Sequence, residues 1–153
     1  MSEFLRSEFG SLFGAADRGQ IQAKIDAGLI SVDDCDIDGL FSRMAHLPAT
    51  SRIQWDKVPN ISLQLPSDQD GVVMKCKLEL IRSIGGFYQL ESERGYLFED
   101  LFADCVLQMD FETFGRLEGN FFETAGHKYF LSISGDWLVN FTMEEQLYFS
   151  NRI

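Results

Sequence analysis

The chain has 153 residues, 45% of them hydrophobic and 24% charged, and its 24 acidic and 13 basic residues give a net charge of −11. This length and composition predict one globular domain over 1–153, and the negative charge disfavours direct binding of nucleic acid because it repels phosphates. The sequence shows neither an apolar run long enough to span a membrane nor the basic start of a signal peptide, so we expect a cytoplasmic protein without membrane contact.

Three short helices are predicted in the first third of the chain, where apolar residues recur with the helical period. They cover 3–13, 17–29 and 37–47, and Pro48 lies just beyond the third, as is common after a helix. We interpret 1–48 as an N-terminal helical subdomain.

The pattern changes to alternation after Trp55, which is typical of half-buried strands. It predicts strands over 61–65 and 72–80, separated by the turn-forming residues 66–71. The Gly85-Gly86 pair predicts a second tight turn. This part of the chain is therefore interpreted as an antiparallel meander.

The segment near residues 98–110 interrupts these strands. Its apolar residues fall on one helical stripe: Phe98, Leu101, Phe102, Cys105, Val106 and Met109. This stripe predicts one further helix, although 105–111 also fits a strand, and the sequence leaves that alternative open.

The clearest local feature is a hairpin predicted over Lys128–Met143. Gly135-Asp136 suits a two-residue turn, because glycine adopts positive φ at little steric cost. A loop of this length would pair Phe130 with Phe141. Helices followed by mostly antiparallel strands predict an α+β fold, in which N-terminal short helices pack on a mostly antiparallel β-sheet over 55–153.

Few residues suggest catalysis or metal binding. Residues 34–39 match the opening of an EF-hand loop, but Ala45 stands where calcium needs a glutamate, so we interpret these acids as helix caps. His46 lies at a predicted helix end and His127 in a predicted loop. The cysteines are odd in number and lack zinc-site spacing: Cys35, Cys76 and Cys105. We predict no metal, no cofactor and no enzymatic activity.

The acidic residues are concentrated in the window 86–126, which holds nine acids and two bases and so carries −7 of the net charge. On the predicted helix, Asp100, Asp104 and Leu107 lie opposite the apolar stripe, and Phe111 joins them if the helix continues. Apolar anchors ringed by acids suit recognition of a basic protein. The predicted partner-binding residues are Glu99, Asp100, Asp104, Leu107, Asp110 and Phe111.

We therefore expect an acidic protein-binding module that neutralises or regulates a basic protein partner. A bacterial immunity protein, or an inhibitor of a nuclease or nucleic-acid-binding toxin, would have this size and charge. One alternative is a small hydrolase that uses a carboxylate or His127, which predicts a deep pocket. Another is a structural or assembly module that dimerises through a sheet edge, which predicts concentration-dependent oligomers.

Overall fold

The protein is described by a computed structural model that covers residues 3–7, 10, 15–33, 61–64, 72–99, 106–117, 128–141 and 146–151. The helices are α1 (Glu3–Arg6), α3 (Ala15–Asp26), α5 (Val72–Tyr88) and α6 (Phe111–Gly115). The strands are β1 (Ser31–Asp33), β2 (Ile61–Gln64), β3 (Arg94–Glu99), β4 (Val106–Asp110), β5 (Lys128–Ser132), β6 (Leu138–Phe141) and β7 (Gln146–Ser150).

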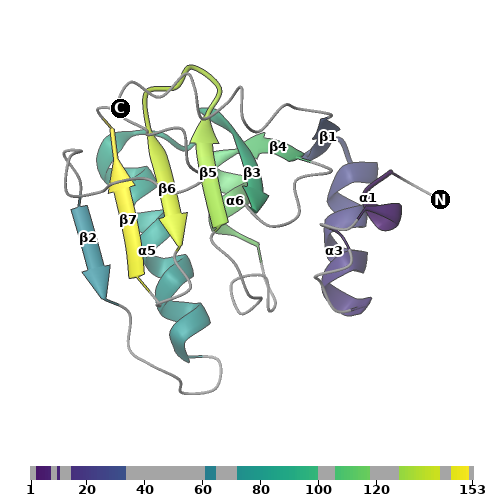
Figure 1. The fold of residues 1–153 in the computed structure, drawn as a ribbon, viewed down its shortest axis with the longest axis horizontal. Coiled ribbons are helices and arrows are strands. Elements are labelled where there is room, and N and C mark those ends of the chain that lie inside the picture. The colour runs from purple at the N-terminus through teal and green to yellow at the C-terminus, as the bar shows by residue number, and fades with distance from the viewer. Residues whose placement is uncertain are drawn as a thin grey trace.

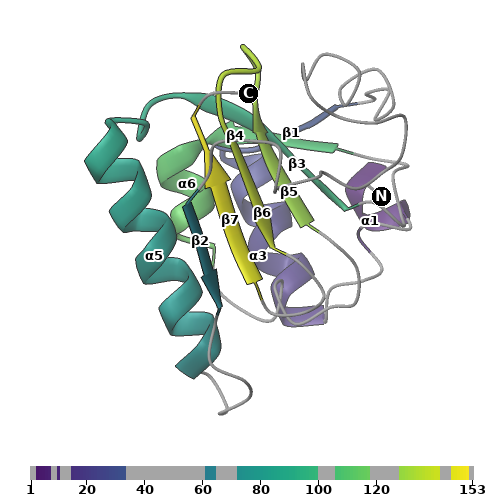
Figure 2. The ribbon, with the colours of Figure 1, turned by 60° about the vertical axis from the view of Figure 1, so that its left-hand side comes forward.

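Within the described residues, the strands form one seven-stranded sheet in the order β1-β4-β3-β5-β6-β7-β2, and each neighbouring pair is antiparallel (Figure 1). Helices α3, α5 and α6 lie against one face of this sheet (Figure 2). The predicted α+β class is confirmed. The strand predicted over 61–65 is confirmed by β2, and α3 lies within the helix predicted over 17–29 apart from its first two residues.

The hydrophobic core lies between the helices and the sheet. The register places Leu97, Phe130 and Val139 side by side in one row across β3, β5 and β6. Ile81 of α5 and Phe114 of α6 belong to the same buried cluster. Burial of such large apolar side chains supplies most of the free energy that holds the layers together, at about 25 cal/mol per Å² of apolar surface.

The central strands are also buried on the face away from these helices. Phe98 of β3 and Tyr129 of β5 are fully buried there, with their rings stacked at a centroid distance of 5.4 Å. Asn140 is the polar member of this face, and its Nδ2 donates a hydrogen bond to the Lys128 carbonyl oxygen at 3.0 Å. A buried amide needs such a partner, because an unpaired polar group in a low-dielectric interior is destabilising.

The predicted hairpin is confirmed, but its loop is longer than two residues. Phe130 pairs with Val139 instead of Phe141, so the register differs from the predicted one by two residues. The Ser132 hydroxyl accepts a hydrogen bond from the backbone N–H of Asp136 at 2.7 Å, which satisfies a loop donor in the wider turn. Because the shift is an even number, every side chain keeps its predicted face.

The strand predicted over 72–80 and the turn at Gly85-Gly86 are wrong. Both segments belong to α5, which runs without interruption from Val72 to Tyr88. Its apolar residues fit the helical period as well as the alternating one, so periodicity alone did not decide between them. Ile81 is buried and Ile84 is half-buried against the core, as expected for the inner face of a helix.

The helix predicted near 98–110 is also wrong, because β3 and β4 occupy most of this segment and a helix begins only at Phe111. In β4, Leu107 and Met109 belong to the core beneath the helices, while Gln108 between them is half-buried on the other face. Antiparallel pairing with β3 satisfies the backbone. The strand alternative for 105–111 is confirmed over 106–110. The helix predicted over 37–47 lies outside the described residues.

The two adjacent glycines of α5 provide a test of this packing. A Cβ atom at Gly85 would lie 2.8 Å from Cδ1 of Phe111, whereas one at Gly86 would meet only Oε1 of Glu91, at 3.8 Å. We expect Gly86→Ala to stabilise the protein by about 0.5–1 kcal/mol, as alanine does in a helix. We expect Gly85→Ala to destabilise it by about 1–3 kcal/mol, because the ring of Phe111 must move.

Urea denaturation of the two glycine variants measures the difference. Equal stability of Gly85→Ala and Gly86→Ala would show that α5 does not approach Phe111 as closely as described.

Candidate functional site

Two residues predicted as exposed anchors are buried. Leu107 lies opposite Leu97 on the helix-covered face of the sheet. Phe111 begins α6 and packs against the rings of Phe130 and Trp137, at centroid distances of 5.8 and 5.1 Å. Both side chains are at most 1% exposed. The prediction of surface anchors at these positions is therefore wrong, because a strand directs Leu107 inward and α6 directs Phe111 onto the sheet.

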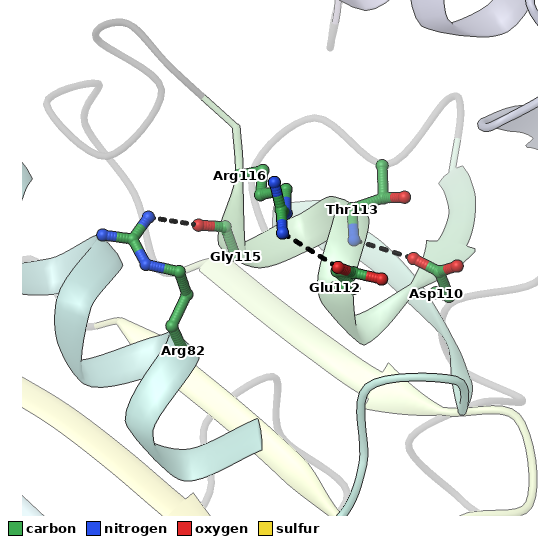
Figure 3. A network of polar contacts seen from close by, with 6 residues as sticks. All are labelled: Arg82, Asp110, Glu112, Thr113, Gly115 and Arg116. Carbon is green, nitrogen blue, oxygen red and sulfur yellow. Dashed lines mark hydrogen bonds and ion pairs between the residues drawn. The ribbon is translucent and has the colours of Figure 1, made fainter. Parts of the chain in front are cut away.

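Asp110 has a structural role at the start of α6. Its carboxylate Oδ1 accepts a hydrogen bond from the backbone N–H of Thr113 at 2.7 Å, and its backbone is extended, as expected of an N-cap (Figure 3). The Asp110 side chain remains half-buried, so it still adds negative charge near the surface. Its contribution to partner binding stays a prediction.

Glu99 is fully buried at the end of β3. The register places it directly opposite Lys128 of β5, which is also buried. Cross-strand neighbours have Cβ atoms about 5 Å apart, so an acidic and a basic side chain lie next to each other away from water. Glu99 therefore contributes to the interior and not to an exposed acidic surface. Asp100 and Asp104 lie outside the described residues, and their predicted role is untested.

Acidic residues do come together where three turns meet at one end of the sheet. The first turn joins α5 to β3, and the second is the start of α6. The backbone N–H of Phe111 donates to the Glu93 carbonyl oxygen at 2.8 Å, and that of Glu112 donates to the Glu91 carbonyl oxygen at 3.1 Å. These two bonds fix the first turn against α6.

The third turn is the β5–β6 loop, which is bonded to the same place. The backbone N–H of Ile133 donates to the Arg94 carbonyl oxygen at 3.1 Å. The indole Nε1 of Trp137, whose ring is buried, donates to Oε1 of Glu93 at 3.3 Å. Side-chain and backbone bonds therefore hold all three turns in one arrangement.

We call the five carboxylates of these turns the acidic rim: Glu91, Glu93, Asp110, Glu112 and Asp136. All but the half-buried Asp110 are exposed. Two bases lie among them. Arg94 is exposed, and Arg116 forms an ion pair with Glu112 at 3.0 Å on the surface of α6 (Figure 3). The rim carries five negative and two positive charges, so its local potential is negative at neutral pH.

Phe87 is an exposed aromatic residue beside the acidic rim. Its side chain is 80% exposed, and its ring meets that of Tyr88 edge to face at 4.9 Å. Tyr88 in turn packs on the buried Phe149, so the ring of Phe87 is connected to the core through Tyr88. Gly86 immediately precedes Phe87 on α5, and the Glu91 carboxylate lies close to Gly86. An exposed aromatic ring next to carboxylates can insert into a pocket on a partner while the acids meet basic side chains.

The sequence pattern did not identify Phe87. It directly follows the predicted Gly85-Gly86 turn, in a part of the chain interpreted as an antiparallel meander. The observed helix α5 instead places Phe87 in its last turn, where the helical period does not show whether a side chain is exposed. Glu91 and Glu93 lie in the acidic window but were not among the predicted partner-binding residues. Asp136 lay outside that window, in the hairpin turn.

The described residues bring together no group of three or more His, Cys, Asp or Glu side chains that could hold a metal ion. The segment 34–39, His46, His127 and two of the cysteines lie outside the described part of the chain, and of Cys76 only the backbone is described. No helix among the residues described is long and apolar enough to cross a membrane. Comparisons with protein-family models, curated proteins and solved structures found no match to this chain.

Proposed function

We propose that the chain is an acidic protein-binding module that neutralises or regulates a basic protein partner in the cytoplasm. The observation that carries this proposal is the acidic rim with the exposed ring of Phe87 beside it. The partner class is a nuclease or another nucleic-acid-binding toxin, and the module would act as its immunity protein or inhibitor. It acts by binding and not by catalysis.

The charges of the rim support a basic partner. A protein surface that binds nucleic acid carries lysine and arginine side chains arranged to meet phosphates. Carboxylates fixed on three bonded turns can occupy that surface and exclude the nucleic acid. The same charges steer the two proteins together, and the net charge of −11 extends this attraction beyond the contact area.

The rigidity of the rim supports tight binding. Its segments are tied together by the backbone bonds of Glu91 and Glu93 and by the indole of Trp137. A surface that is already ordered loses little conformational entropy on binding. Phe87 adds apolar area that a partner pocket can bury, and such aromatic anchors carry a large share of the affinity at protein interfaces.

Charge reversal in the rim tests this proposal. Glu91→Lys with Asp136→Lys replaces two exposed carboxylates whose side chains are not needed to hold the turns. The matched control is Glu3→Lys with Glu79→Lys, which makes the same change in net charge at exposed positions away from the rim. Wild type and control are expected to retain a basic protein from the native lysate at low salt, and the rim variant is expected to lose it.

The retained protein is then purified and its association with each variant is measured. We expect the rim variant to associate about tenfold or more slowly than the control, with a smaller dependence on salt. Neutralisation predicts that the wild-type chain inhibits the partner's activity, for example cleavage of plasmid DNA by a nuclease. Equal retention and equal association rates for the rim variant and the control would reject the rim as the binding surface.

A further inference from the structure

A second surface of the protein has the opposite charge. A groove of about 630 Å³ lies between α3 on one side and α5 and α6 on the other. The described residues that α3 and the turn after it contribute to the groove are Gln20, Ala23, Lys24, Ala27 and Leu29. Arg82 of α5 and Arg116, which follows α6, complete the described lining.

Every charged residue in the described lining is basic, although the chain has 13 bases against 24 acids. Lys24, Arg82 and Arg116 come from three different elements, so the fold brings them together. Glu112 balances part of the charge of Arg116, and an anion between the three basic side chains would balance the charges of Lys24 and Arg82 as well.

Both guanidinium groups also make a hydrogen bond within the protein. Nη1 of Arg82 donates to the carbonyl oxygen of Gly115 at 3.1 Å, and Nη2 of Arg116 donates to Oε1 of Glu112 at 3.0 Å (Figure 3). Each of these bonds uses one of the five N–H donors of a guanidinium. The remaining donors can bind a ligand without losing these contacts.

The Gly115 bond by itself would explain Arg82 as a residue that caps the end of α6, where a positive charge is favourable. It does not explain Lys24, which reaches the same groove from α3, nor the apolar wall beside it. That wall consists of Ala23, Ala27 and Leu29, and the Leu29 side chain is 49% exposed. The groove therefore combines a cationic end with an apolar surface.

We propose that this groove binds a small phosphorylated molecule, with its phosphate between Lys24, Arg82 and Arg116 and its apolar part on Leu29. A phosphate suits the site better than a carboxylate, because it carries up to two negative charges and offers three oxygens to the planar forks of two arginines. A compact ligand is required, because the net charge of −11 repels a long polyanion such as nucleic acid. The groove adjoins the acidic rim at Arg116, whose guanidinium lines the groove and also pairs with Glu112.

Titration of the full chain with phenyl phosphate, followed by NMR of the backbone amides, tests the proposal. We expect saturable shifts at Lys24, Leu29, Arg82 and Arg116, tighter binding than for inorganic phosphate, and no binding of phenol. Lys24→Gln and Arg116→Gln should each weaken phenyl phosphate by about tenfold, since each removes a charge-assisted contact.

Arg94→Gln is the matched control, because it removes the same charge at an exposed position in the acidic rim. It should bind phenyl phosphate as the wild type does, as should the rim variant Glu91→Lys with Asp136→Lys. An equal loss in Arg94→Gln, or an absence of shifts at the groove, would overturn the proposal. Equal affinity for phenyl phosphate and inorganic phosphate would overturn the role of the Leu29 wall. The test of the protein-binding function remains distinct, because its variant changes Glu91 and Asp136, and neither residue belongs to the described lining of the groove.

Discussion

Lys128→Met is expected to lower the free energy of unfolding by about 3–5 kcal/mol, because it leaves the buried carboxylate of Glu99 facing an apolar side chain. Methionine has a length close to that of lysine, so the change removes mainly the charge. Chemical denaturation in urea measures the loss. The half-exposed Lys24 is the control, since Lys24→Met should change stability by no more than about 0.5 kcal/mol.

The double variant Lys128→Met with Glu99→Met separates the charge pair from simple packing. We expect its stability to lie close to that of the wild type, because an apolar pair of similar volume replaces two buried charges. The coupling energy between the two positions should therefore be large in a double-mutant cycle. If the losses of the two single variants merely add in the double variant, the two charges do not stabilise each other across β3 and β5.

Phe111→Ala is expected to destabilise the protein by about 3–5 kcal/mol, whereas Phe87→Ala should leave stability within about 0.5 kcal/mol. The two positions have the same side chain but opposite environments. Phe111 is buried among the rings of Phe114, Phe130 and Trp137, so its loss leaves a cavity. The side chain of Phe87 is 80% exposed. Thermal and urea denaturation of both variants measure the difference.

Phe87→Ala should weaken binding of the basic partner even though it leaves stability unchanged. Once the basic partner has been purified, Phe87→Ala is expected to weaken its binding by about 2 kcal/mol, mainly through faster dissociation. A Phe87→Ala variant that binds the partner as tightly as the wild type would remove Phe87 from the proposed interface. If Phe111→Ala had the stability of the wild type, this result would contradict the burial of Phe111 in the core.

Local chemistry predicted the hairpin well. Its existence follows from the glycine at position 135 between two strand-like segments, and its central place in the sheet agrees with the apolar residues on both of its faces. The length of the loop could not be predicted in this way. In the wider loop the Ser132 hydroxyl accepts a hydrogen bond from the backbone N–H of Asp136, and the sequence pattern does not indicate this bond. This bond to a side chain outside the expected turn accompanies a pairing that differs from the predicted one by two residues.

Two segments were assigned to the wrong kind of element, for one physical reason. Residues 72–88 and 98–110 are apolar on more than one side, so both the helical and the alternating pattern fit them. In such segments, tertiary contacts determine whether a helix or a strand forms. Gly85 allows α5 to approach Phe111, and β4 pairs with β3, and neither contact is local in sequence.

The candidate site was predictable in charge but not in shape. Four carboxylates of the rim lie within the acidic window 86–126: Glu91, Glu93, Asp110 and Glu112. Asp136 joins them only because the β5–β6 loop bonds to Arg94 across the sheet. The exposed position of Phe87 could not be predicted, because the sequence pattern indicated a turn at Gly85-Gly86 and not the helix to which these residues belong.

The pairing of β2 with β7 has a consequence for the newly synthesised chain. The register sets Ile61 opposite Phe149, two residues that lie far apart in the sequence. A ribosome delivers the chain from its N-terminus, so β2 emerges long before β7, the strand with which it pairs. Closing so long a loop is slow, and an unpaired strand edge can pair with another nascent chain in the meantime. Aggregation during translation is therefore a hazard of this sheet order until β7 has paired with β2.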